Sequence, residues 1–381
     1  MSTATTISVN GERLQRMRTA AGYSRTELAT MVDVSASALT RLEAGQHDVD
    51  AGVIENLARV LHCAPQLLAR PLPDVLFTRP WLRAYADAPK KVVDQHIADT
   101  LLAIEAFKGL GLRLVPDSLP IFRGDLNDEE AIDDFAATVR EAASIDIDTP
   151  IPNVTRAAER LGCVVLPLES ELGKHLGMSM YVDGIPVLRV ARPSGNDGVP
   201  GDRQRFTLAH ELAHLTLHAS HPAPDTTEEA KAIEKQAHRF AGAFLLPGDA
   251  FLAHLDELGG RATLSTLTKM KGRWGVAIKA MVIRLQQLHR IDSDQARSLY
   301  KQISSRGMNK REPVEVVNER AIWFARSARD RMGDGFESAA SEAALLDTIF
   351  ITSWMAWEPV AESAPVIDLA ARRVNRRGAA I

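Results

Sequence analysis

The sequence predicts an α+β fold that is mainly helical. From Gly11 to about Arg70 it falls into short segments of helical periodicity with turn signals such as Gly22 between them, which is typical of a small all-helical domain. Strand-like segments gather between 164 and 190, so the expected sheet is small. Beyond Pro247 the apolar periodicity is helical again, which predicts a helical C-terminal region.

Length and composition predict several folded units. A chain of 381 residues is too long for one ordinary core, because single domains usually stop near roughly 100 to 200 residues. With 45% hydrophobic and 25% charged residues, most of it should fold. We expect four parts: an N-terminal domain (1–70), a helical connector (71–145), a second domain (146–313), and a C-terminal helical region with a basic tail (314–381), the tail being Ala364 to Ile381.

The sequence carries no secretion or membrane signal that we recognise. Met1 to Val9 is polar, and no run of about 18 apolar residues occurs. Cys63 and Cys163 are far apart and outside any CxxC pattern, which argues against a disulfide framework and a cysteine-ligated zinc. We therefore expect a cytoplasmic protein with no membrane partner. Because the net charge is only −4, nucleic-acid binding would have to come from a local surface.

Two short helices are predicted close together near the N-terminus. Ser24 is expected to cap a helix over Arg25–Met31, and Ser35 a helix over Ala36–Ala44. Only three residues separate them, which is helix-turn-helix geometry. The second helix of such a unit enters the major groove of DNA with its N-terminus first. The residues expected to face bases or flanking phosphates are Ala36, Ser37, Thr40 and Arg41, with Arg25 and Thr26 near the DNA backbone.

The alternative to a DNA-binding domain is a small helical domain that binds proteins. Gly11 to Arg70 holds seven arginines and seven acidic residues, so this segment is not basic overall. Residues 22–45, however, resemble the phage-repressor (XRE) class of helix-turn-helix domains, and Glu43-x-Gly45 matches the helix end of that class. The class usually has a glutamine early in each helix, where this chain has Arg25 and Ala36. The resemblance implies binding to double-stranded DNA, and a homodimer that occupies two half-sites.

Three strands are predicted before the second motif. Val164 to Leu166 is typical of a buried strand. Met178–Val182 and Pro186–Val190 flank Asp183-Gly184, which predicts a β-hairpin.

The segment from Arg203 to His218 contains the pattern HExxH and favours a helix, with Asp202 as its expected N-cap. The i, i+4 spacing puts His210 and His214 on one helix face, where two imidazoles converge on one zinc ion. Glu211 is then expected to act as general base towards a metal-bound water.

A catalytic zinc needs a third protein ligand, and we expect Glu234. Glu234, Ala237, His238 and Ala241 share one face of the next helix, and the alanines would allow close approach to the first helix. Glu228, Glu229 and His218 are the competitors, but a third histidine one turn farther along a straight helix lies too far from the same ion.

His218, His221 and His238 are expected to line the cleft or to orient ligands. Tyr181, His218 and His238 are candidates for stabilising an oxyanion, and the strand Val187–Val190 is expected to offer an open edge to an extended substrate.

The stretch from Pro150 to about Pro313 resembles the ImmA/IrrE family of metallopeptidases. The most specific segments are Arg205–His214 and Glu234–Pro247, and Lys271–Ile278 and Glu312-Pro313 are also similar. The resemblance implies a zincin-like domain, a small sheet plus the HExxH helix, with zinc held by both motif histidines and the downstream glutamate. It also implies the cutting of a repressor, and XRE domains are often fused to this peptidase. His238 stands where the family usually has Asn or Asp.

Two functional hypotheses follow. The first is a DNA-binding regulator with a zinc-dependent endopeptidase domain, active or latent, that cleaves a repressor or its own linker. The second is a non-cleaving transcription factor or antitoxin-like DNA binder, with a toxin as partner, whose zinc domain is a sensor. An intact Glu211 favours catalysis, because a structural zinc site usually fills all four positions and needs no base. The operator, the substrate and the activating signal are not encoded in any pattern that we recognise.

Overall fold

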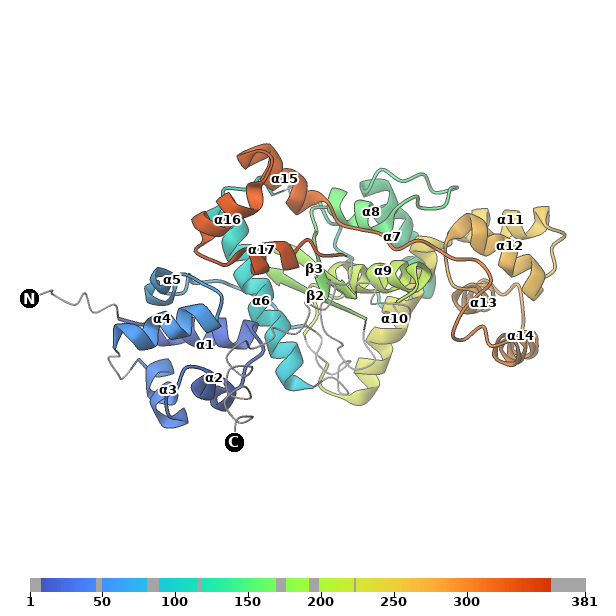
Figure 1. Cartoon of the computed structure of the whole chain (residues 1–381). Helices are drawn as coiled ribbons and strands as arrows, with labels where there is room; N and C mark the ends of the chain where they lie inside the picture. Colours follow the sequence, from blue (N-terminus) through green and yellow to red (C-terminus); the bar gives the residue numbers. More distant parts are fainter. Residues whose placement is uncertain are drawn as a thin grey trace, which may run out of the picture.

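The computed structural model describes residues 8–45, 50–80, 89–114, 118–168, 176–191, 199–222 and 224–357. The molecule is elongated, with the N-terminal helices at one end, the sheet in the middle and helices α11 to α14 at the other end (Figure 1). In the described part of the chain, no helix is long and apolar enough to span a bilayer. The predicted basic tail, Ala364 to Ile381, lies outside the described residues.

Five helices form the N-terminal unit: α1 (Gly11–Ala20), α2 (Arg25–Met31), α3 (Ala36–Glu43), α4 (Ala51–Val60) and α5 (Pro65–Ala69). The Ser24 side chain accepts a hydrogen bond from the backbone N–H of Glu27, and the Ser35 side chain accepts one from Ala38. These caps begin α2 and α3 where the sequence predicts them. Leu14, Leu28, Leu39 and Leu57 are buried in one core, and the predicted helix-turn-helix pair is therefore confirmed.

The sheet has three strands, β1 (Val164–Leu168), β2 (Gly177–Val182) and β3 (Ile185–Ala191), in the order β1-β3-β2. β2 and β3 form the predicted hairpin, and Asp183 and Gly184 at its turn both have positive φ. β1 pairs parallel to β3 on the other side. The prediction that Val187–Val190 presents an open edge is therefore wrong, because β3 is hydrogen-bonded along both edges and β2 is the edge strand beside it.

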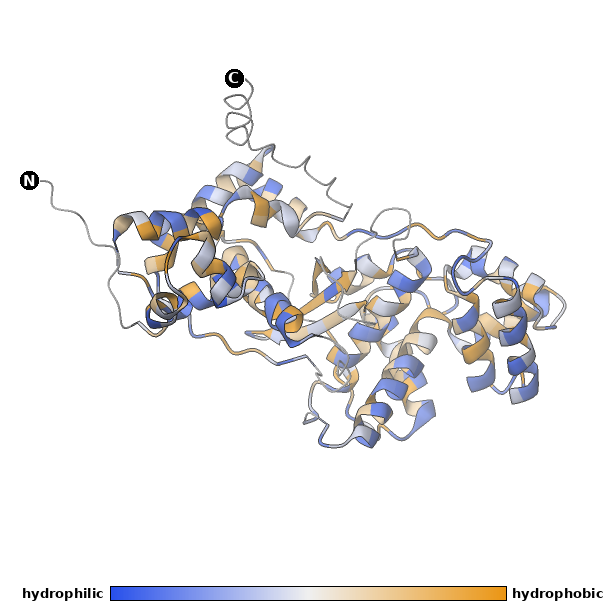
Figure 2. Cartoon of the chain, turned by 60° about the horizontal axis from the view of Figure 1, so that its bottom comes forward, coloured by the Kyte–Doolittle hydropathy of each residue, from blue (hydrophilic) through white to orange (hydrophobic). Residues whose placement is uncertain are grey.

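Helices cover both faces of the sheet. α9 (Gly201–Leu217) and α10 (Thr227–Leu245) lie on one face, together with α7 (Glu129–Ala142) and α8 (Val154–Arg160). α6 (Lys90–Gly109) packs on the other face, against Met178, Met180 and Val182 of β2. The strands are accordingly coloured mainly hydrophobic in Figure 2, as expected of a sheet buried on both sides.

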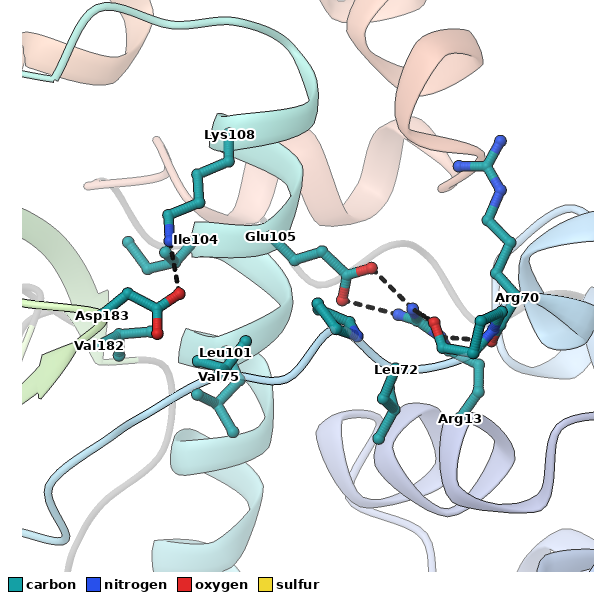
Figure 3. A pocket seen from close by; sticks show the side chains of 12 residues that line it. Arg13, Arg70, Leu72, Val75, Leu101, Ile104, Glu105, Lys108, Val182 and Asp183 are labelled. Carbon is teal, nitrogen blue, oxygen red and sulfur yellow. Dashed lines mark hydrogen bonds and ion pairs between the residues drawn. The ribbon is translucent and has the colours of Figure 1, made fainter.

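α6 also connects the sheet to the N-terminal unit. The carboxylate of Glu105 on α6 receives two hydrogen bonds from Arg13 on α1, both 2.7 Å long. One turn later, Lys108 forms an ion pair with Asp183 at the hairpin turn, 2.5 Å apart (Figure 3). Three further helices, α15 (Trp323–Met332), α16 (Phe336–Ala344) and α17 (Thr348–Ser353), complete this core. The N-terminal helices and the sheet thus share one continuous apolar core.

The far end of the molecule is helical, as the sequence predicts. It consists of α11 (Gly248–Glu257), α12 (Leu264–Trp274), α13 (Ile278–Gln287) and α14 (Ser293–Ser305). Trp274 and Phe251 meet edge to face in its core, with ring centroids 5.8 Å apart. Together with the sheet layer, this confirms the α+β, mainly helical fold class.

Candidate metal centre and DNA-facing surface

α9 carries the HExxH pattern, and its first turn differs from the prediction. The helix begins at Gly201 with Pro200 at the N-cap position, so Asp202 is not the cap. Asp202 is instead buried and forms an ion pair with Lys271 on α12, 2.5 Å apart, and Lys271 also binds Glu312 at 2.6 Å. A buried charge needs a partner of opposite charge, and here that partner comes from 69 residues away. This pairing fixes the start of α9 against the far helices.

Three side chains converge where α9 and α10 pack together. His210 Nε2 lies 3.1 Å from His214 Nε2 and 3.3 Å from Glu234 Oε2, and His214 Nε2 lies 3.6 Å from Glu234 Oε1. All three ligand atoms lie within 4.8 Å of one another. A tetrahedral zinc site with bonds of about 2.0–2.1 Å has edges of about 3.3 Å, so the spacing fits such an ion. Ala237 and Ala241 are fully buried on the same face of α10.

Glu211 is held by the edge strand β2. Its Oε2 accepts a hydrogen bond of 2.7 Å from the hydroxyl of Ser179, and only 4% of Glu211 is exposed. Gly177 leaves room for the carboxylate, because a Cβ there would lie 2.7 Å from Cγ of Glu211 and from Cγ2 of Thr207. We did not single out Ser179 or Gly177 from the sequence, although Ser179 is a polar residue between two methionines in a predicted strand.

The surroundings of the two motif histidines, His210 and His214, shift their pKa values in opposite directions. Burial lowers the pKa of His214 well below its ordinary value, and the neighbouring rings of His210 and His218 add to this effect. Burial also acts to lower the pKa of His210, but the hydrogen bond to Glu234 and the charges of Glu211 and Glu234 outweigh it and raise that pKa. His214 is therefore neutral near pH 7, which is the form that binds metal.

The other sequence candidates lie around this centre. His218 is fully buried behind His214, and their Nδ1 atoms are 3.1 Å apart. His238 is exposed, with its ring centroid 4.7 Å from that of His210. The Tyr181 hydroxyl donates to the carbonyl of Leu215, 3.0 Å away. Glu229 caps the first turn of α10, while Glu228 and His221 are exposed, and none of these three belongs to the metal-ligand group found among the described residues.

The outer edge of β2 is partly covered by the segment that follows the N-terminal unit. The backbone N–H of Thr78 donates to the carbonyl of Tyr181 at 3.0 Å, and that of Asp183 donates to the carbonyl of Leu76 at 2.7 Å. Phe77 pairs antiparallel to Val182. Residues 76–78 thus add an isolated β-bridge to one end of the edge, starting two residues beyond the Ser179 that binds Glu211.

The predicted DNA-facing residues form an exposed surface on α2 and α3. Ala36, Ser37, Thr40 and Arg41 are all exposed on α3, the first two at its start and Arg41 in its last turn, and Arg25 and Thr26 are exposed on α2. Arg41 has no ion-pair partner in the described ranges, whereas Nε of Arg25 lies 2.5 Å from Oε2 of buried Glu43. Glu43 also binds Arg18. One arginine is therefore available to a ligand, and the other is held by the protein.

The fold and the site define a helix-turn-helix unit combined with a peptidase-type domain. Residues 11–70 match the family model of a helix-turn-helix domain, and residues 158–286 match that of the IrrE N-terminal-like domain of the M78 peptidases. The chain therefore joins a helix-turn-helix domain to an M78-type domain similar to the N-terminal part of IrrE. A search of curated proteins gives no match. The crystal structure of ComR from Streptococcus suis matches at 14% identity, over 91% of this chain and 94% of that chain, with a TM-score of 0.15, too low for any structural argument.

Proposed function

We propose that this protein is a DNA-binding transcriptional regulator whose M78-type domain holds zinc and cleaves a protein partner, a repressor being the expected substrate. The convergence of His210, His214 and Glu234, with Glu211 beside them, is the observation that carries the proposal. Two imidazole nitrogens and one carboxylate are a donor set that suits zinc and leaves a fourth position open. That open position is what separates a catalytic site from a structural one.

The roles of the residues follow from their positions. Bound zinc supplies a Lewis acid that polarises a peptide carbonyl and lowers the pKa of water. Glu211 accepts the proton of the attacking water and passes it to the leaving amine. Ser179 donates a hydrogen bond to one carboxylate oxygen of Glu211 and so fixes the orientation of the carboxylate. The backbone of the edge strand β2 at Ser179 offers hydrogen bonds to an extended substrate.

His238 is the residue we propose for stabilising the oxyanion. Its exposed ring lies beside the ring of His210, with centroids 4.7 Å apart. His218 is turned away behind His214, and the Tyr181 hydroxyl donates to a backbone carbonyl. Of the three candidates from the sequence, His238 is thus the one whose ring is exposed beside a proposed zinc ligand, which supports this role.

Zinc content tests the metal part of the proposal. The full chain should hold about one zinc after purification, and Glu234→Ala should lose it. Glu228→Ala is the matched control, because Glu228 is an exposed acid six residues earlier on the same helix and should leave zinc content unchanged. If the wild-type chain holds no zinc, or if both variants lose it equally, the proposed ligand set is wrong.

A second candidate function has one observation in its favour. Residues 76–78 occupy the outer edge of β2 next to the site, so the protein's own chain takes up part of the place for a substrate strand. This favours a sensor or antitoxin-like DNA binder that cleaves rarely. A chain that binds zinc and operator DNA but cuts none of the repressors encoded beside its gene would support this alternative, with a toxin as the partner to seek.

A further inference from the structure

The imidazole of His214 is the start of a row of polar side chains that leads away from the metal site. Its Nε2 faces His210 and Glu234, while its Nδ1 lies 3.1 Å from Nδ1 of His218. Nε2 of His218 lies in turn 3.1 Å from Oε1 of Gln236 on α10. His218 is fully buried and Gln236 is half-buried. The row therefore runs from the metal site through the buried His218 to Gln236 on α10.

One arrangement of protons suits both this row and a metal ion. An amide oxygen can only accept, so Oε1 of Gln236 requires a proton on Nε2 of His218. Neutral His218 then has Nδ1 as its acceptor, which requires a proton on Nδ1 of His214. His214 in that form has its lone pair on Nε2, the atom that faces the other two ligands. The opposite arrangement would place a proton on Nε2 of His214 and block metal binding.

We propose that Gln236 and His218 are positioning residues that fix the tautomer and the ring orientation of His214. The inference rests on the proposed zinc site and adds two residues to it. Metal-binding histidines usually donate their second N–H to an oxygen acceptor. Here the acceptor is Nδ1 of His218 instead, and the amide oxygen of Gln236 keeps the proton of His218 on Nε2. His210 has no such support, because its buried Nδ1 lacks a hydrogen-bond partner in the described part of the chain.

Position 236 can be changed without disturbing a packed core. Gln236 borders a cavity of about 430 Å³ that is also lined by Leu126, His221 and Ile233. Gln236→Met keeps the length of the side chain and removes the acceptor. Gln236→Glu keeps an acceptor at the same place. Gln15→Met changes an exposed glutamine of α1, and it is the control for the replacement of glutamine by methionine outside the proposed row.

Zinc affinity of the full-length variants tests the proposal, measured at pH 8 by competition with a chromogenic chelator. We expect Gln236→Met to weaken zinc binding about tenfold or more, as second-layer changes do at such sites. Gln236→Glu should stay within about threefold of wild type, and Gln15→Met should be unchanged. Equal affinities for all four proteins would overturn the proposal.

Nitrogen-15 NMR of the histidine rings in the metal-free protein gives a second readout. The wild type should show His214 protonated at Nδ1 and His218 protonated at Nε2, and Gln236→Met should lose this pattern while Gln236→Glu keeps it. A wild-type His214 protonated at Nε2 would overturn the inference. If the wild-type chain binds no zinc, the proposed function fails, and the NMR result still decides whether Gln236 and His218 set the tautomer.

Discussion

The hydroxyl of Ser179 on the edge strand β2 donates a 2.7 Å hydrogen bond to the carboxylate of Glu211 on α9. The bond joins the strand expected to bind a substrate to the residue expected to move its proton. Both side chains are buried, so the bond is shielded from water. Strand and base are therefore positioned together.

Ser179→Ala should lower the rate of cleavage without loss of metal. A hydrogen bond to a charged group contributes about 1.5–3 kcal/mol, so loss of the bond should reduce kcat by roughly tenfold or more. Zinc content should remain at the wild-type level, because Ser179 does not touch the three ligands. Steady-state kinetics and metal analysis of the same preparation check this, and a parallel loss of zinc would argue for a structural role instead.

Gly177→Ala should displace Glu211. The new methyl group would lie 2.7 Å from carbon atoms of Glu211 and Thr207, too close for any real contact. We expect a loss of stability of about 1–3 kcal/mol and little remaining cleavage. Gly272→Ala is the contrasting variant, since nothing lies within 4 Å of a Cβ there and the residue is exposed in α12. It should gain about 0.4–1 kcal/mol. Urea unfolding measures both, and equal effects would contradict the close packing at Gly177.

Arg41→Ala should weaken DNA binding through a lost phosphate or base contact. If the contact is to a phosphate, the slope of log Kd against log salt should fall by about 0.9. Arg25→Ala should perturb the protein more, because Arg25 is paired with buried Glu43. Fluorescence anisotropy with a duplex in a salt series measures the slope, and thermal melting separates loss of binding from loss of fold. An Arg41→Ala slope equal to that of wild type would remove Arg41 from the interface.

The metal-free protein should lose stability between about pH 6.5 and pH 4 because of His218. Burial lowers the pKa of His218 to about 4, while in the unfolded chain it is about 6.5. Between these values the unfolded chain binds the proton and the folded chain does not, so stability falls as pH falls. His218 alone should contribute a loss of about 2 kcal/mol at pH 5 relative to pH 8, and His214 and His238, whose pKa values are also lowered in the folded protein, add to the total. His218→Asn should show a smaller pH dependence in urea unfolding, and an unchanged dependence would contradict the assignment.

Local sequence patterns predicted the parts of this fold that depend on near neighbours. Ser24 and Ser35 cap helices within three residues of themselves, and Asp183-Gly184 turns the hairpin by its own backbone geometry. The i, i+4 spacing of His210 and His214 likewise needs only the helix that carries it. Glu234 was predicted to approach them from the face that it shares with small residues, and the structure brings its carboxylate within 3.6 Å of both rings.

Long-range partners explain what the sequence did not reveal. Asp202 is not a cap because Lys271 draws it into a buried ion pair, and β3 is not an edge because β1 pairs with it from the other side. Ser179 contacts Glu211, and Gln236 contacts His218, only because β2 and α10 each pack against α9, and no local pattern predicts that packing. The division into parts at about residues 70, 145 and 313 remains a prediction.

The most direct test of the account compares wild type with Glu211→Gln. Each full-length protein, analysed for zinc, is incubated with the repressor proteins encoded beside its gene, and the products are identified by mass spectrometry. The account predicts that both proteins hold about one zinc, that wild type cuts a repressor, and that Glu211→Gln cuts none. Equal cleavage by both proteins, or cleavage that persists when the zinc is removed, would contradict the central claim that Glu211 and a zinc centre carry out the reaction.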